Sequence, residues 1–168
     1  KNVGTGKQVT VSGLSLGGAD AGNYSLTQPV LNDGVIAPAT LTVTATGVNK
    51  VYDAGTTATV ILSDDRVLGD VLTLGYTASF SDKNVANGKS VSVSGISITG
   101  GVDAGNYTLG NTTAVTTANI TPATLTATIT ASNKIYDGNT SATILTRSLV
   151  GIIGTDNVVA NADGLATF

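Results

Sequence analysis

Hydrophobic residues alternate with serine and threonine along several short stretches of this chain. Val91 and Val93 alternate with serines, and Leu41, Val43 and Ala45 alternate with threonines in the same way. Alternation with a period of two is typical of a β-strand that buries one face. The pattern therefore predicts short, half-buried strands, and helix-period patterns are weak throughout.

Glycines interrupt this alternation at defined places. After Gly95 the hydrophobic phase slips by one residue to Ile96 and Ile98, and Gly13 is followed by the same slip. A slip of one residue would turn a strand inside out, so we expect a β-bulge at both glycines. Asn87-Gly88 lies between two strand-like runs and predicts a two-residue hairpin turn.

The same series of motifs occurs twice in the chain. Pro38 and Pro122, in I-x-P-A-T-L-T, are 84 positions apart (122 − 38), and so are Tyr52 and Tyr136 in K-x-Y-D. Aspartate, asparagine and glycine favour turns because the polar side chains bond nearby backbone and glycine accepts a left-handed conformation. The residues of the repeat motif are Asp20, Gly22, Asn23, Tyr24, Pro38, Tyr52 and Asp53 in the first copy and Asp103, Gly105, Asn106, Tyr107, Pro122, Tyr136, Asp137 and Gly138 in the second.

This repeat divides the sequence into three segments. Residues 1–37 are the C-terminal half of a repeat, residues 38–121 are a complete repeat, and residues 122–168 are the N-terminal half of another. Junctions of two or three residues favour a stiff rod over flexible beads. We therefore expect an all-β chain of tandem small antiparallel β-domains arranged as a rod.

Each half-repeat alone would expose hydrophobic strands and open sheet edges. We therefore expect its partners to be neighbouring copies of the same repeat. They would join head to tail within one long chain, or between chains by sharing strands.

The amino-acid composition limits which ligands and which catalytic residues are possible. The chain has a net charge of −3 and a pI near 4.5, which argues against a nucleic-acid partner. It has no histidine or cysteine, so neither a Ser-His-Asp arrangement nor a zinc or disulfide framework is available. No hydrophobic run approaches the ~18 residues that span a bilayer, and we expect no membrane insertion.

In their order and spacing, the K-x-Y-D-G-x-T, D-A-G-N-Y-x-L and I-x-P-A-T-L-T motifs resemble the YDG/MBG-type repeats of large, filamentous-haemagglutinin-like bacterial surface adhesins. The resemblance implies small β-rich domains, β-grasp-like or sandwich-like, that form a scaffold without catalysis. It also implies an extracellular or bacterial cell-surface location. The chain departs from the motif at Ala54-Gly55, where the glycine arrives one position late.

Two functions remain open after this resemblance. The first is a structural segment of an adhesin stalk or surface filament; the alternative is an adhesive module that binds glycans or cells through a loop such as 63–70. An enzyme is the remote third case. The adjacent carboxylates Asp64 and Asp65 would point to opposite faces of a strand, so they would not converge for glycoside hydrolysis.

Calcium is the one cofactor with a candidate set, although turn formation explains the same aspartates. The set is Asp20, Asp53, Asp103 and Asp137, and none of their spacings matches a known calcium loop. The repeated tyrosines could stack on a glycan, but their regular recurrence favours core anchors. Asn-x-Ser/Thr triplets at Asn23, Asn106, Asn111, Asn119 and Asn139 leave glycosylation open.

Overall fold

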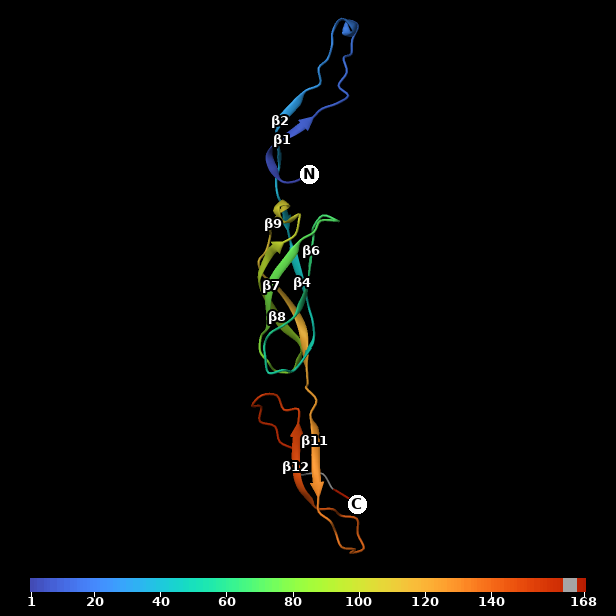
Figure 1. Cartoon of the computed structure of the whole chain (residues 1–168), viewed down its shortest axis with the longest axis vertical. Helices are drawn as coiled ribbons and strands as arrows, with labels where there is room; N and C mark the ends of the chain where they lie inside the picture. Colours follow the sequence, from blue (N-terminus) through green and yellow to red (C-terminus); the bar gives the residue numbers. More distant parts are fainter. Residues whose placement is uncertain (162–165) are drawn as a thin grey trace. The chain divides into compact units, whose positions relative to one another are not determined.

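The chain is all-β in the computed structural model, as the alternation predicts, and the structure describes residues 1–161 and 166–168 (Figure 1). Its helical elements among these residues are two short 3-10 turns, η1 and η2. No helix in the described ranges has the length and hydrophobic character needed to cross a membrane. The elements are β1 Gly4–Thr10, η1 Ala21–Asn23, β2 Val30–Ile36, β3 Ala39–Leu41, β4 Val43–Gly47, β5 Lys50–Val51, β6 Val60–Asp64, β7 Thr73–Phe80, β8 Ala86–Gly100, η2 Ala104–Asn106, β9 Tyr107–Leu109, β10 Ala114–Thr121, β11 Thr126–Ala131 and β12 Ile144–Val150.

The chain divides into two compact units, each built from three segments. Unit 1 comprises Lys1–Ala45, Leu62–Thr77 and Val93–Ala114. Unit 2 comprises Thr46–Ile61, Ala78–Ser92 and Val115–Phe168. Each unit therefore contains residues from two successive sequence repeats.

Strand pairing in unit 1 joins distant parts of the sequence. β1 and β2 pair antiparallel, from Gly4 opposite Ile36 to Thr10 opposite Val30. β3 and β9 pair parallel, with Ala39 opposite Tyr107. The D-A-G-N-Y turn thus leads directly into a strand that pairs with the segment after Pro38.

In unit 2, β10 pairs parallel with β5 through Ile120 opposite Lys50, and β11 pairs antiparallel with β12. The largest sheet has the strand order β5-β10-β8-β7, and β4 pairs with β6.

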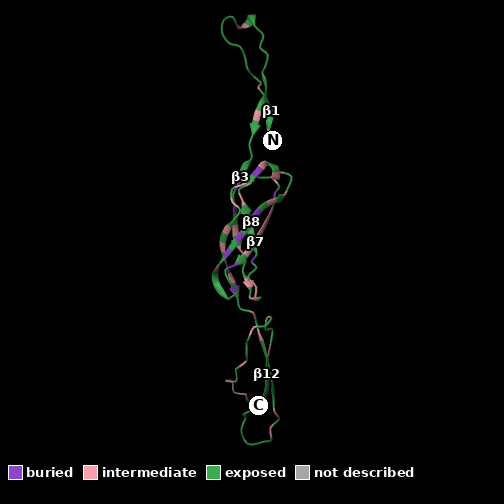
Figure 2. Cartoon of the chain, turned by 90° about the vertical axis from the view of Figure 1, so that its left-hand side faces the viewer, coloured by how far each residue is buried: buried purple, intermediate pink, exposed green. Residues whose placement is uncertain are grey.

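Buried hydrophobic residues come from the complete repeat, and Figure 2 shows them in purple. They follow the predicted alternation, because the strands place every second side chain on the inner face. Unit 1 buries Leu41, Val43, Leu72, Val93, Ile96 and Tyr107. Unit 2 buries Ala58, Val60, Phe80, Val91, Ala118 and Ile120.

Hydroxyl pairs link neighbouring strands on their exposed faces. The hydroxyl oxygens lie 3.0 Å apart in Thr44–Ser63 and Thr77–Ser94, 2.5 Å apart in Thr128–Ser148 and 2.6 Å apart in Thr130–Thr146. Cross-strand pairs of this kind stabilise a sheet by about 0.2–1 kcal/mol each. Threonine and serine hydroxyls thus link neighbouring strands on these faces, a role that charged side-chain pairs have in other sheets.

The predicted hairpin turn at Asn87-Gly88 is wrong. Both residues lie inside β8, although Gly88 has a left-handed φ of +62° and donates its N–H to Asn119 Oδ1 at 2.8 Å. The chain reverses earlier, where Asp82 Oδ1 accepts the N–H of Asn84 at 2.7 Å. A left-handed glycine is therefore compatible with a continuing strand here, because it hydrogen-bonds to the side chain of Asn119, 31 residues further along the chain.

The predicted slip at Gly95 is confirmed, and the predicted bulge at Gly13 is wrong. Val93 and Ile96 are both buried, and Gly95 between them has a φ of +63°. Gly13 also has a positive φ of +80°, but β1 ends at Thr10 and Gly13 lies outside any strand. A bulge requires a paired strand, which this part of the half-repeat lacks.

Candidate functional site

The lysine of the K-x-Y-D motif folds back into the turn that follows it. Lys50 Nζ lies 2.7 Å from Asp53 Oδ1 and donates to the carbonyl oxygens of Gly55 and Thr57 at 2.8 and 3.1 Å. The Gly55 N–H donates to the same Asp53 oxygen at 2.9 Å. Lys50 first, and then the Gly55 N–H, lowers the pKa of Asp53.

The second copy of the motif has the same contacts. Lys134 Nζ lies 2.7 Å from Asp137 Oδ1 and donates to the carbonyl oxygens of Asn139 and Ser141 at 3.0 and 3.1 Å. The bond to Lys134 is the main cause that lowers the pKa of Asp137. The motif is therefore a self-contained turn in which a lysine satisfies carbonyls that would otherwise need water.

The late glycine of the first copy has a clear structural consequence. Ala54 has a left-handed φ of +63°, and its counterpart Gly138 has a φ of +78°. The turn therefore keeps its shape although alanine carries a Cβ that disfavours this conformation.

The D-A-G-N-Y turn is also the same in both copies. The φ and ψ angles are −100° and 7° at Asp20 and −103° and 3° at Asp103. They are −127° and 151° at Tyr24 and −130° and 152° at Tyr107. The turn forms in both copies as predicted, but the predicted reason is wrong, because neither Asp20 nor Asp103 caps its 3-10 turn with its side chain and neither turn glycine has a positive φ.

A cluster of polar side chains in unit 1 joins residues of two successive repeats. This cluster, junction cluster 1, comprises Lys1, Asp70, Asp103 and Tyr107. Lys1 Nζ lies 2.9 Å from Asp70 Oδ1 and 3.6 Å from Asp103 Oδ1, and the Tyr107 hydroxyl donates to Asp70 Oδ2 at 2.8 Å. The N–H of Val67 in turn donates to the Tyr107 oxygen at 2.9 Å.

Hydrogen bonds, charges and burial shift the pKa values of the residues in junction cluster 1. The bond from Lys1, followed by the bond from Tyr107, lowers the pKa of Asp70. The bond to Asp70 raises the pKa of Lys1, and burial is the main cause that raises the pKa of Tyr107. The cluster is therefore an ion pair held by a neutral tyrosine at neutral pH.

Unit 2 contains the equivalent arrangement, junction cluster 2, formed by Tyr52, Lys83 and Asp156. The Tyr52 hydroxyl donates to Asp156 Oδ2 at 2.7 Å, and Lys83 Nζ lies 3.5 Å from Asp156 Oδ1 and 5.9 Å from the centre of the Tyr52 ring. Tyr52 is the main cause that lowers the pKa of Asp156. The Tyr52 hydroxyl, followed by the Asp156 charge, raises the pKa of Lys83.

The lysine and the aspartate of the two clusters correspond in the repeat, whereas the tyrosines come from different motifs, Tyr107 from D-A-G-N-Y and Tyr52 from K-x-Y-D. Lys1 corresponds to Lys83 in K-N-V, and Asp70 corresponds to Asp156. In both cases the lysine comes from one predicted repeat and the aspartate from the next. The same ion pair therefore occurs at two successive repeat junctions.

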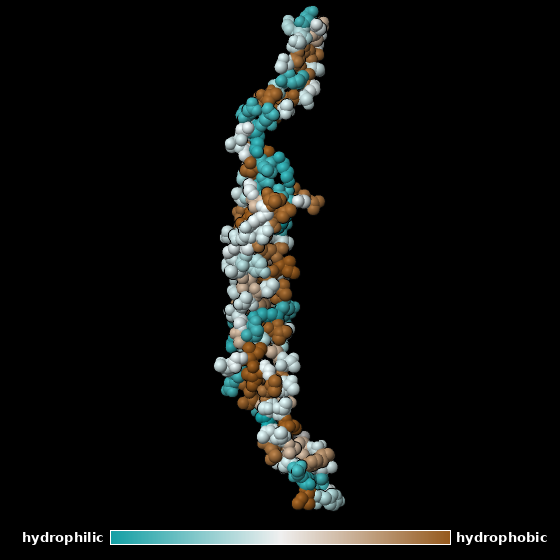
Figure 3. Space-filling model, in the orientation of Figure 1, coloured by the Kyte–Doolittle hydropathy of each residue, from teal (hydrophilic) through white to brown (hydrophobic). Residues whose placement is uncertain are grey.

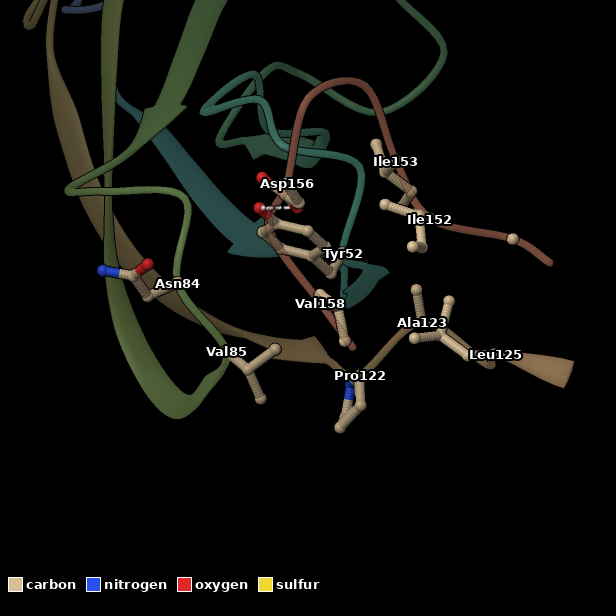
Figure 4. Close-up of a pocket in the computed structure, with 11 residues that line it drawn as sticks. Tyr52, Asn84, Val85, Pro122, Ala123, Leu125, Ile152, Ile153, Asp156 and Val158 are labelled. Carbon is tan, nitrogen blue, oxygen red and sulfur yellow. Dashed lines mark hydrogen bonds between the residues drawn. The ribbon is translucent and has the colours of Figure 1, made fainter. Parts of the chain in front are cut away.

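A pocket lies beside each junction cluster. The unit 1 pocket has a volume of about 280 Å³, and its lining includes Val3, Ile36, Asn106 and Tyr107. The unit 2 pocket has a volume of about 290 Å³ (Figure 4), and its lining includes Tyr52, Asn84, Val85, Pro122, Ala123, Leu125, Ile152, Ile153, Asp156 and Val158. Figure 4 shows the Tyr52 ring among the hydrophobic residues of the lining, with its hydroxyl hydrogen-bonded to Asp156.

Comparison with known proteins places these motifs in one family. The YDG domain matches residues 1–30 and 37–117. The chain belongs to the YDG domain family. No curated protein and no solved structure matches it. Both D-A-G-N-Y turns and the first K-x-Y-D turn lie within the matched residues.

In this YDG chain three of the four aspartates considered for calcium have separate partners. Asp53 and Asp137 pair with the lysines of their own turns, and Asp103 Oδ2 accepts the N–H of Val71 at 3.0 Å. Asp20 lies before η1. Among the described residues no three acidic side chains come together as a metal site would need.

The adjacent pair Asp64 and Asp65 serves the backbone and a neighbouring arginine. Asp64 binds the guanidinium of Arg66, which is the main cause that lowers the pKa of Asp64. Asp65 Oδ1 accepts the N–H of Thr42 at 2.7 Å. The two carboxylates thus have different partners.

The prediction that all four repeated tyrosines are core anchors is only partly right. Tyr107 is buried and Tyr52 is half-buried, but Tyr24 and Tyr136 are exposed. The two exposed tyrosines lie in residues 1–37 and 122–168, the predicted half-repeats. Pro38 lies between β2 and β3, and Pro122 follows β10.

Sequence reasoning did not find the ion pairs of the junction clusters. The recurrence of lysine in K-N-V and of aspartate at positions 70 and 156 was visible. The contact itself joins residues 69 and 73 positions apart. Its only sequence signal is that both partners recur with the repeat.

Proposed function

We propose that this chain is a structural repeat segment of an extracellular bacterial adhesin stalk or surface filament, without catalysis. In this proposal its domains are small β-grasp-like or sandwich-like modules that follow one another as a rod. Their task is to span distance. Neighbouring copies of the repeat are the partners, and neither a cofactor nor a nucleic acid is needed.

The recurrence of the junction clusters is the observation that supports this function most directly. A flexible string of beads would not need the same lysine–aspartate pair, with a tyrosine bonded to the carboxylate, at successive junctions. Surface ion pairs contribute little free energy each, about 0–1 kcal/mol. Their value here is to fix the orientation of one repeat on the next, which is what a stalk requires.

The test is to duplicate residues 38–121 in tandem and measure the maximum dimension in dilute solution by small-angle X-ray scattering. A folded repeat of this size should add about 30 Å or more, from the scaling of domain size with length. A matched control carries four glycines inserted between Ala37 and Pro38, which should broaden the distribution of dimensions. An unchanged maximum dimension, or a glycine insertion without effect, would contradict the stalk.

The loop 63–70 supports a second candidate, a glycan- or cell-binding module. Leu68 is fully exposed in this loop and Val67 is largely exposed, although exposed hydrophobic residues usually require an explanation only when they cluster. In a binding module, Leu68→Asp would abolish retention on glycan-coated beads. In a stalk segment the same change would leave the scattering profile unaltered.

A further inference from the structure

The pocket of unit 2 has the walls of the unit 1 pocket but lacks two of its components. In unit 1, Asn106 and Tyr107 of the D-A-G-N-Y turn line the pocket. In unit 2 the lining includes Val85 and Ala123, the counterparts of Val3 and Ala39 in the unit 1 pocket, together with Tyr52, whose hydroxyl donates to Asp156 Oδ2. No D-A-G-N-Y turn contributes to it.

Unit 1 shows which contacts the D-A-G-N-Y turn makes when the strand that follows it is paired. β9 pairs parallel with β3, and Gly110 donates its N–H to the Leu41 oxygen at 2.8 Å. Asn106 Oδ1 accepts the N–H of Val3 at 3.0 Å, and Tyr107 donates to Asp70. The turn therefore adds a strand, caps an amide and completes the ion-pair cluster.

Every group that receives the turn in unit 1 has a counterpart in unit 2. Residues 123–125 repeat the A-T-L sequence of β3, Val85 repeats Val3, and Asp156 repeats Asp70. Residues 122–125 lie outside any strand, and Leu125 is partly exposed, whereas Leu41 is fully buried. The receiving edge is thus present but unpaired.

The first D-A-G-N-Y turn, Asp20–Tyr24, is not directly followed by a paired strand in the part of the chain that the structure describes. Tyr24 is 73% exposed, whereas the equivalent Tyr107 is 8% exposed. The backbone angles of the two turns nevertheless agree to within a few degrees. The free turn is therefore already in its bound shape, so docking it would cost little conformational entropy.

Hydrophobic residues of both predicted half-repeats are exposed, and Figure 3 colours the hydrophobic residues at the surface brown. Leu14, Leu26 and Ile36 are exposed in the N-terminal half-repeat, and Val158 and Phe168 in the C-terminal half. Their counterparts Ile96, Ile120, Leu72 and Phe80 are buried in the complete repeat, and Leu109 is partly buried. The two half-repeats thus expose positions that are buried or partly buried in the complete repeat.

We propose that the occupant of the unit 2 pocket is the segment Asp20–Leu26 of a second copy of this chain. Tyr24–Leu26 of the second copy pairs parallel with residues 123–125. Asn23 accepts the N–H of Val85, and Tyr24 donates to Asp156 as a second tyrosine beside Tyr52, whose hydroxyl already donates to Asp156 Oδ2 at 2.7 Å. This inference deepens the proposed function by naming the contact through which one copy joins the next.

The first test is sedimentation equilibrium of the full chain from about 1 μM to about 1 mM, the range of weak specific association. The average mass should rise with concentration. Tyr24→Ala should weaken this association about tenfold or more, as buried tyrosine anchors do at interfaces. Val115→Ala is the matched control, because Val115 is also 73% exposed and lies on β10 outside the pocket.

The second test uses the absence of cysteine from the chain. Chains with Ser25→Cys and chains with Thr124→Cys are mixed and oxidised, because parallel pairing would bring these positions within disulfide reach, about 4.4–6.8 Å between Cα atoms. A mixed dimer should form faster than in the control mixture of Ser25→Cys with Val115→Cys.

A chain that stays monomeric at every concentration overturns this inference. So does association that Tyr24→Ala leaves unchanged, or mixed dimers that form equally fast in the control. These results would leave the stalk proposal standing, because it depends on the dimension added per repeat. A failure of that scattering test would in turn leave the association measurement intact.

Discussion

The complete repeat and the half-repeats carry the same residue types at matching positions but bury them very differently. Phe80 is 3% exposed, and its counterpart Phe168 is 67% exposed. The turns nevertheless have the same backbone angles in both regions. Local sequence therefore determines the turns, whereas burial of the hydrophobic face requires the opposite half of the repeat.

The largest expected effect is at the tyrosine of the D-A-G-N-Y turn. Tyr107→Ala should lower the free energy of unfolding by about 3 kcal/mol, because it leaves a cavity in the core. Tyr24→Ala, at the same motif position, should change it by less than about 0.5 kcal/mol, as exposed positions usually do. Urea unfolding in dilute solution measures both. Equal effects would mean that the N-terminal half-repeat is as well packed as the complete one.

A smaller effect is expected at the left-handed position of the Y-D turn. Ala54→Gly should stabilise the protein by about 0.5–1 kcal/mol, since the relief of Cβ strain exceeds the added freedom of the unfolded chain. Gly138→Ala should destabilise it by about 1 kcal/mol for the reverse reason. Thermal unfolding of the two variants checks this pair. A loss of stability in Ala54→Gly would show that the backbone there is unstrained.

The smallest expected effect is on the stability of the folded state at acidic pH. Lys1 and Tyr107 lower the pKa of Asp70 below its ordinary value of 3.8, so the folded state binds this proton less tightly than the unfolded state. The resulting stability is present above pH 3.8 and is lost as the pH falls through the lower, folded pKa. Asp70→Asn should therefore flatten the decline in stability below pH 3.8.

Asp156→Asn is the comparison for that measurement. Its pKa is lowered in the same direction, mainly by Tyr52, so the sign of the effect is the same. The Asp156 side chain is more exposed to water than that of Asp70, so its effect should be weaker. Unfolding followed by denaturant at several acidic pH values ranks the two. A steeper acid decline in either variant would show that the carboxylate is not held by its partners.

The sequence could predict the local features of this fold. The alternation at Leu41 and Val43 and the phase slip at Gly95 follow from short-range sterics and hydrogen bonding. The Asp53 turn follows from side-chain bonding to nearby backbone. These features depend only on a few neighbouring residues.

The remaining features depend on partners far along the chain. A left-handed glycine at position 88 is equally compatible with a hairpin and with a continuing strand, and Asn119 decides between them. The burial of Tyr107 and the exposure of Tyr24 cannot be read from identical motifs. Likewise, the Lys1–Asp70 pair joins two repeats, and no local pattern encodes it.

The hydroxyl pairs between strands have a consequence for the environments this protein tolerates. Ions in solution weaken attraction between exposed charges over distances of about 8–10 Å at moderate salt. A hydrogen bond between Thr128 and Ser148, or between Thr130 and Thr146, carries no net charge for those ions to weaken. The β11–β12 ribbon should therefore hold its register in brine as well as in dilute buffer.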